Sequence, residues 1–81
     1  MGGYLMFDYF INNSKLQLVF DNDPGDYDKH EKEYELIHDL CIEYFQEKIN
    51  IDWRDNNTLD IYPVTENWKL FIDRLQLELS N

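Results

Sequence analysis

Apolar and polar residues alternate along two short stretches near the start of the chain, and this period of two is typical of β-strands. Large apolar side chains occupy every second position of residues 4–11, and residues 16–20 show the same alternation. Asn-Asn-Ser-Lys separates the two stretches, and Asn favours tight turns because it tolerates positive φ and hydrogen-bonds its own backbone. The sequence therefore predicts an N-terminal β-hairpin.

A helical period replaces the alternation from residue 28 to about residue 48. Here apolar residues recur at intervals of three and four, which predicts one buried stripe along an amphipathic helix. Pro24-Gly25 indicates a turn before it. Asp28 is the expected N-cap, because Glu31 three residues later completes the pattern of a capping box.

The second half of the chain repeats this order. Residues 49–62 alternate around an Asp-Asn-Asn-Thr turn, Pro63 ends the last strand, and Thr65 is the expected N-cap of a final amphipathic helix. The segments FDYFINNSKL and IDWRDNNTL also share an apolar–Asp–aromatic start and an Asn-Asn-Ser/Thr turn. They are consistent with two duplicated ββα units, residues 4–49 and 50–81. Alternatively, hairpins of independent origin have converged on the same turn.

The order ββαββα predicts an α+β fold, in which a four-stranded antiparallel sheet carries both helices on one face. The chain has 81 residues, of which 43% are hydrophobic and 16% aromatic, and this composition favours a single domain with a folded core despite the high charge. The open face of the sheet would then carry a mixed set of polar side chains. We expect it to present Lys15, Gln17, Asn50, Asp52 and Arg54, beside the aromatic residues Tyr9, Phe10 and Tyr62.

The net charge of −10 is concentrated in one third of the sequence. Residues 20–47 contain ten acids and two bases, a net of −8, and the other residues contain seven acids and five bases, a net of −2. Such acidity argues against direct binding to nucleic acid or to an anionic membrane and favours a basic protein partner. No apolar run approaches the ~20 residues of a membrane span. The stretch MGGYLMFDYF has no basic region and no cleavage site, so we expect no signal peptide, and with a single cysteine we expect a cytoplasmic protein.

Catalytic, cofactor and metal signatures are not evident. Counting an EF-hand loop from Asp21 puts Lys32 at position 12, and counting from Asp26 puts Ile37 there, whereas the loop requires Glu. A looser carboxylate site for a divalent ion remains an alternative for this stretch. No Gly-rich phosphate loop or serine-nucleophile motif occurs. We therefore expect a protein that is not an enzyme and that uses no cofactor.

Three residues of the first helix nevertheless suggest chemistry in principle. Glu35 and His38 have the Glu-x-x-His spacing of di-iron bundles, and His38 with Cys41 has the spacing of a dyad on one helix. The expected alternatives are a histidine at the helix surface and an inert, buried thiol, because Cys41 falls on the apolar stripe.

Acids recur every four residues along the first helix, and more precede it. Like charges at this spacing form a ridge on the helix and destabilise it, which suggests a functional reason for keeping them. Tyr27, Tyr34 and Phe10 are the candidate apolar anchors beside the ridge. The nine acids of this candidate partner-binding surface are Asp21, Asp23, Asp26, Asp28, Glu31, Glu35, Asp39, Glu43 and Glu47.

Our leading hypothesis is a small acidic inhibitor that imitates a phosphate backbone and binds the basic nucleic-acid groove of a nuclease or nucleic-acid-binding effector. Phage anti-CRISPR and anti-restriction proteins and nuclease immunity proteins have this general size and charge, which is a likeness of composition only. The alternatives are a charged face that only maintains solubility, and an interaction or assembly domain that uses the sheet face, as a homodimer for example.

Overall fold

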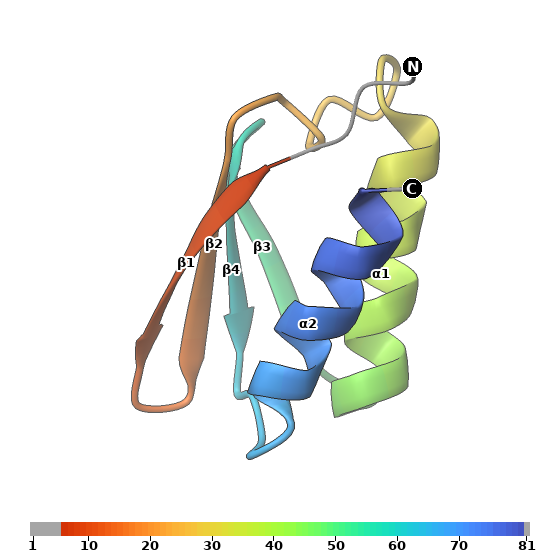
Figure 1. Ribbon diagram of the computed structural model, residues 1–81. Helices are drawn as coiled ribbons and strands as arrows, with labels where there is room; N and C mark the ends of the chain where they lie inside the picture. Colours follow the sequence, from red (N-terminus) through yellow and green to blue (C-terminus); the bar gives the residue numbers. More distant parts are fainter. Residues whose placement is uncertain (1–5, 81) are drawn as a thin grey trace.

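The computed structural model describes residues 6–80 and contains four strands and two helices in the order ββαββα. This order and the single antiparallel sheet confirm the predicted α+β fold (Figure 1). The elements are β1 (Phe7–Asn12), β2 (Lys15–Phe20), α1 (Glu31–Phe45), β3 (Asn50–Asp55), β4 (Thr58–Tyr62) and α2 (Trp68–Leu79).

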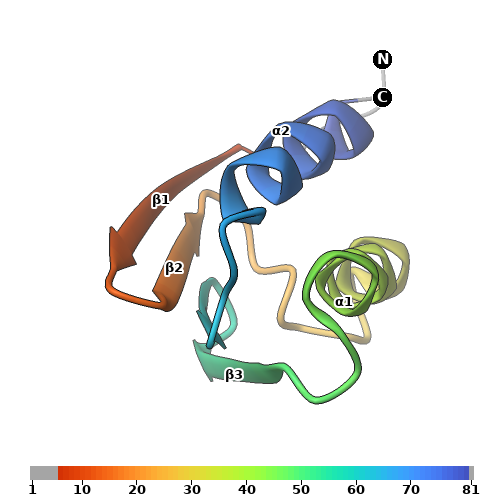
Figure 2. The ribbon, with the colours of Figure 1, turned by 90° about the horizontal axis from the view of Figure 1, so that it is seen from below.

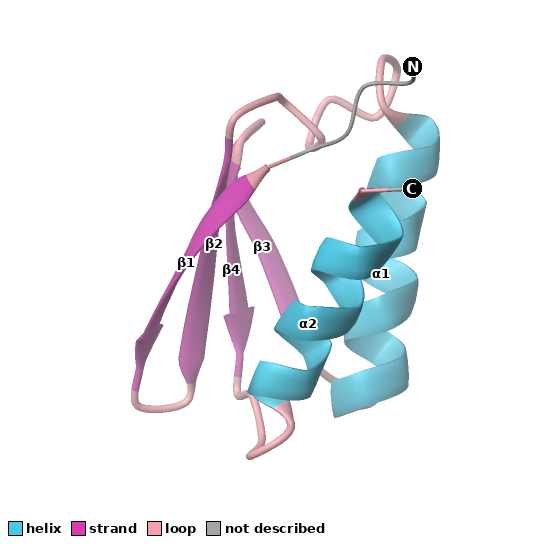
Figure 3. Cartoon of the chain, in the orientation of Figure 1, coloured by secondary structure: helices cyan, strands magenta, loops and turns pink. Residues whose placement is uncertain are grey.

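The sheet has the strand order β1-β2-β4-β3, with every neighbouring pair antiparallel. Each hairpin therefore contributes one central strand and one edge strand, and the hairpins meet where β2 pairs with β4 (Figure 3). The pairing of β3 with β4 shifts register between Trp53 and Asp55, as in a β-bulge.

Both helices cover the same face of the sheet (Figure 2). Helix α2 lies over β1, where the rings of Trp68 and Tyr9 are 5.9 Å apart, and α1 lies over β3, where the rings of Tyr34 and Trp53 are 5.9 Å apart. Tyr9 therefore faces the helices and not, as one expectation had it, the open face of the sheet. The core comprises Leu16, Leu18, Phe20, Ile37, Leu40, Cys41, Phe45, Leu59, Ile61, Val64, Phe71, Ile72, Leu75 and Leu79.

The prediction that Asp28 caps α1 is wrong. The helix begins at Glu31, and its N-cap residue, His30, makes no side-chain capping hydrogen bond. Residues 26–30 instead form a turn, in which the backbone N–H groups of Lys29 and His30 both donate to the carbonyl of Asp26. Asp28 therefore lies within this turn, two residues before the N-cap position.

Two other helix boundaries differ from those predicted. Helix α1 ends at Phe45, because Gln46 has a φ of 112° and turns the chain, so that Glu47 and Lys48 lie outside the helix. Helix α2 begins at Trp68 after Asn67, while the Thr65 hydroxyl accepts the Asn67 N–H in the preceding turn. The predicted start of the first strand, residues 4 and 5, lies outside the described residues.

Candidate functional site

The acidic surface, as we call the nine predicted acids, lies on α1, on the segment that leads into it and, at Glu47, in the turn that follows it. Eight of the nine side chains are exposed and Asp26 is half-buried. Glu31, Glu35, Asp39 and Glu43 follow one another on successive turns of α1, as predicted. Glu47 continues the row only in sequence, because it lies in the turn after the helix.

This surface is poorly neutralised within the protein. Among residues 6–80, the acidic surface makes one ion pair, between Glu43 and Arg74 of α2 at 3.7 Å. Arg74 is also bound to Glu78, at 2.9 Å. Lys29 and Lys32, the bases closest in sequence, are exposed and belong to none of the ion pairs of the described residues. Eight of the nine acids therefore have no ion pair with another residue of the range 6–80.

The segment before α1 is fixed to the turn between β3 and β4. The Gly25 N–H donates to the Asn56 carbonyl at 2.7 Å, and the neighbouring Pro24 is buried. A Cβ atom at Gly25 would lie 2.8 Å from both the Asn56 oxygen and the Trp53 ring, which is too close for any other residue. Glycine is thus required here for close approach, and the acids of this segment are held at one end of the sheet.

Tyr27 connects the acidic segment to the acidic row on α1. Its hydroxyl donates to Glu35 Oε2 at 3.0 Å, and its ring is 43% exposed. The hydrogen bond to Glu35 raises the pKa of Tyr27, and the charges of Glu31 and Glu35 add to this effect. The phenol therefore remains protonated and presents a polar aromatic group in the middle of the acidic surface.

Behind Tyr27, a stack of rings joins α1 to β3. The Tyr27 ring meets Tyr34 edge-on at 5.2 Å, and Tyr34 stacks on His38 at 4.3 Å. The indole N–H of Trp53 donates to His38 Nε2 at 3.0 Å, which requires a neutral imidazole. Burial lowers the pKa of His38, against the opposing charge of Asp39. Tyr34, a predicted anchor, is therefore half-buried in a supporting stack.

The groups that suggested catalysis are used in packing. Glu35 accepts from Tyr27 and His38 accepts from Trp53, while Cys41 is fully buried, with burial raising the pKa of its thiol to about 12. Within residues 6–80, no three or more His, Cys, Asp or Glu side chains are grouped to hold a metal ion. No helix in this part of the chain is long and apolar enough to cross a membrane.

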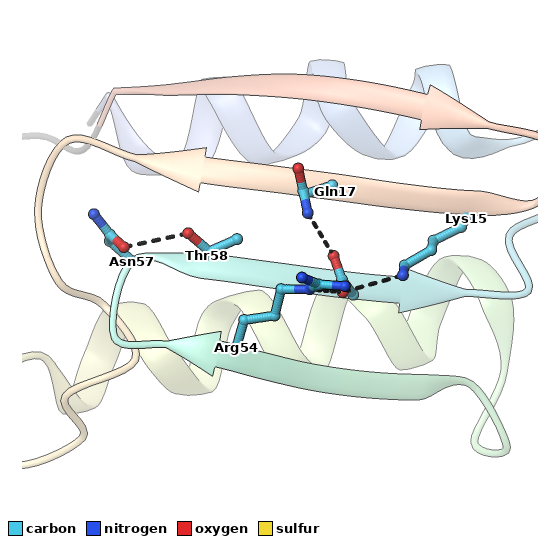
Figure 4. Close-up of polar contacts among 6 residues, drawn as sticks. Lys15, Gln17, Arg54, Asn57 and Thr58 are labelled. Atoms are coloured by element: carbon cyan, nitrogen blue, oxygen red, sulfur yellow. Dashed lines mark hydrogen bonds and ion pairs between the residues drawn. The ribbon is translucent and has the colours of Figure 1, made fainter.

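The structure also contains a polar cluster on the open face of the sheet (Figure 4). The sequence predicted Lys15, Gln17 and Arg54 on this face but not the buried acid that joins them. Its centre is Asp60 of β4, whose side chain is 2% exposed and accepts from Gln17 at 3.0 Å, from Lys15 at 3.3 Å and from Arg54 Nε. Burial alone would raise the pKa of Asp60, but the hydrogen bonds from Arg54, Gln17 and Lys15 outweigh it and lower the pKa. For Asp60 itself, the signal in the sequence was an acid between Leu59 and Ile61 on a predicted strand.

Comparisons with known proteins add no further assignment. No known protein family, no curated protein and no solved structure matches the chain at a significant level. The acidic surface is therefore the feature of the molecule that bears on its function.

Proposed function

We propose that this protein is a small non-enzymatic inhibitor that binds the basic nucleic-acid groove of a partner, such as a nuclease or a nucleic-acid-binding effector. The observation that carries the proposal is the lack of neutralisation: eight of nine acids on one surface have no ion pair among the described residues. A basic groove would supply the missing cations and would attract the surface over long range.

The spacing of the acids on α1 supports a resemblance to a phosphate backbone. Residues four apart on a helix are separated along its axis by about 6 Å. This rise is roughly twice the 3.4 Å axial step between phosphates of one DNA strand. A groove that contacts alternate phosphates would thus find Glu31, Glu35, Asp39 and Glu43 at similar intervals.

The acidic row also has a cost in stability that folding alone does not explain. Acids four residues apart on a helix destabilise it by a few tenths of a kcal/mol each. Those near the helix N-terminus are favoured by the helix dipole, but Glu43 lies near the opposite end. Selection for binding would account for acids kept where they weaken the helix.

Tyr27 is the anchor that the geometry favours at the centre of this surface. Its ring is exposed, it is surrounded by acids, and Glu35 and Tyr34 hold it in place. Aromatic residues of this kind carry much of the affinity at protein interfaces, whereas exposed charges mainly raise the association rate. We expect Tyr27 to contribute affinity and the acids to contribute rate and salt dependence.

The test is capture of partners from a lysate of the host organism by the tagged full chain, at low salt and at about half-molar salt, where the Debye length is only a few ångströms. We expect a nuclease or nucleic-acid-binding protein to be captured at low salt and to be released by added duplex DNA. Reversal of three charges, Glu35→Lys, Asp39→Lys and Glu43→Lys, should abolish this capture.

A matched control reverses three exposed acids elsewhere, Asp52→Lys, Glu66→Lys and Asp73→Lys, which changes the net charge by the same amount. This control should retain the partner. If both triple variants lose capture equally, total charge and not the acidic surface is responsible. A captured partner that neither salt nor DNA displaces would contradict binding in a nucleic-acid groove.

A further inference from the structure

The outer edge of β1 is a free, apolar strand edge in the structure of residues 6–80. β1 ends the sheet, and its backbone groups on the outer side have no partner strand there. Phe10 is 57% exposed and Ile11 is 38% exposed, and Met6 just before the strand is 57% exposed. Asp8 is the only charged residue of the strand. Such an edge invites pairing with another strand.

The opposite edge of the sheet, β3, has the features that discourage pairing. β3 contains Asp52, Arg54 and Asp55, and its register shifts between Trp53 and Asp55. Charges and bulges on an edge strand are common means of preventing edge-to-edge association. β1 occupies the equivalent place in its own hairpin but has only one charged residue, Asp8, and no register shift, so it is less protected against pairing than β3.

We propose that β1 pairs with β1 of a second copy of this chain, so that two four-stranded sheets join into one of eight strands. The distribution of charge favours a second copy at this edge. Four acids of the acidic surface lie on α1, which packs over β3 at the far side of the sheet, as the contact of Tyr34 with Trp53 shows. Asp21 is the exception near β1, because its N–H donates to the Met6 carbonyl at 2.9 Å. Two copies joined through β1 therefore keep the acidic rows of their α1 helices far apart, and both rows remain open to a basic partner.

The residues of β1 also define a self-complementary register. In an antiparallel pair, opposed residues point to the same face of the sheet. In one such register, Phe10 lies opposite Phe10 of the second copy. Tyr9 then lies opposite Ile11 on the helix-covered face, and Asp8 lies opposite Asn12 on the open face. Asp8 then faces an amide and not its own carboxylate, which would be unfavourable.

Sedimentation equilibrium of the full chain over a wide concentration range tests this pairing. We expect a reversible monomer–dimer equilibrium at about 0.15 M salt, where the Debye length is roughly 8 Å and the distant acidic surfaces are screened from each other. Phe10→Lys places two like charges opposite each other at the centre of the seam and should raise the dissociation constant at least about tenfold. Ile42→Lys, at an exposed isoleucine of α1 (42% exposed), is the matched control and should not change it.

Amide hydrogen exchange of the unaltered chain provides a second readout that does not depend on a variant folding. Protection of β1 amides should rise with protein concentration, while that of β3 amides should not. A chain that stays monomeric throughout, or a dimer that Phe10→Lys leaves intact, would overturn the proposal. If the β1 amides become protected from exchange only when a different protein is added, the edge binds that protein and not a second copy.

Discussion

Carboxylates have opposite environments in two regions of this molecule: they are paired with donors on the open face of the sheet and largely unpaired on the exposed side of α1. On the sheet, one buried carboxylate, Asp60, receives hydrogen bonds or ion pairs from three side chains. The nine acids of the acidic surface, which lie on α1 and directly before and after it, share one ion pair among the described residues. The chain has seven bases, and two of them are placed at Asp60.

This difference separates charge that stabilises the fold from charge that the fold only tolerates. Asp60 is buried on the central strand β4, where an unpaired carboxylate would be strongly unfavourable. The acids of α1 are solvated, so their mutual repulsion is small and can persist in the folded state. We therefore expect substitutions in the two regions to change stability in opposite directions.

The largest effect is expected from removal of the buried carboxylate. Asp60→Ala should lower the free energy of unfolding by about 2 to 3 kcal/mol, because Gln17, Lys15 and Arg54 all lose their shared acceptor. Urea unfolding followed by circular dichroism measures this loss. Asp52→Ala, at an exposed acid directly opposite Asp60 on β3, is the control and should change stability by less than about 0.5 kcal/mol. Equal losses in the two variants would show that Asp60 has no special role.

The second effect is the pH dependence of the free energy that Asp60 contributes to folding. The pKa of Asp60 in the folded protein is below its ordinary value of 3.8, since the three donors outweigh burial. A carboxylate with a lowered pKa stabilises the fold above its unfolded pKa, and this stability is lost as pH falls through the folded pKa. The difference in unfolding free energy between the unaltered chain and Asp60→Asn should therefore be constant above about pH 5 and shrink below it. A difference that persists into strong acid would contradict this account.

A substitution on α1 is expected to change the free energy of unfolding by a smaller amount and in the opposite direction. Asp39→Lys places a base four residues from both Glu35 and Glu43, and two such pairs together with the better helix propensity of lysine should raise stability by about 0.5 to 1 kcal/mol. Urea unfolding again measures it. Asp73→Lys on α2 is the control, because the residue four positions earlier is Lys69, and it should give no gain. A loss of stability in Asp39→Lys would mean that the acidic row supports the fold.

The smallest effect is the response to salt. Raising sodium chloride from about 0.05 to about 0.5 M should stabilise the unaltered chain by a few tenths of a kcal/mol, because it screens repulsion among the acids. In the Asp39→Lys variant the same change should have less effect, since attractive pairs are screened too. Thermal unfolding of the unaltered chain and of the Asp39→Lys variant at a series of salt concentrations measures the two responses. Identical responses would show that repulsion on α1 does not limit stability.

The sequence alone determined the order of the elements and the faces that they bury. Periods of two and of about 3.6 are local properties, so the strands and helices and their apolar sides were predictable. The acids of α1 were placed correctly for the same reason, since helical spacing itself puts them on the exposed side. Glu47 was misplaced because the end of α1 depends on the positive φ of Gln46, which no period reveals.

Only the tertiary structure decided which strand edges are free, which carboxylate is buried and how the acidic segment is attached. Each of these depends on residues far apart in the chain: Asp60 and its donor Gln17 are separated by 43 positions, and Gly25 is held by Asn56. Trp53 likewise supports His38 across two elements. Such contacts arise from the packing of the two hairpins and the helices against one another, and a local pattern carries no information about them.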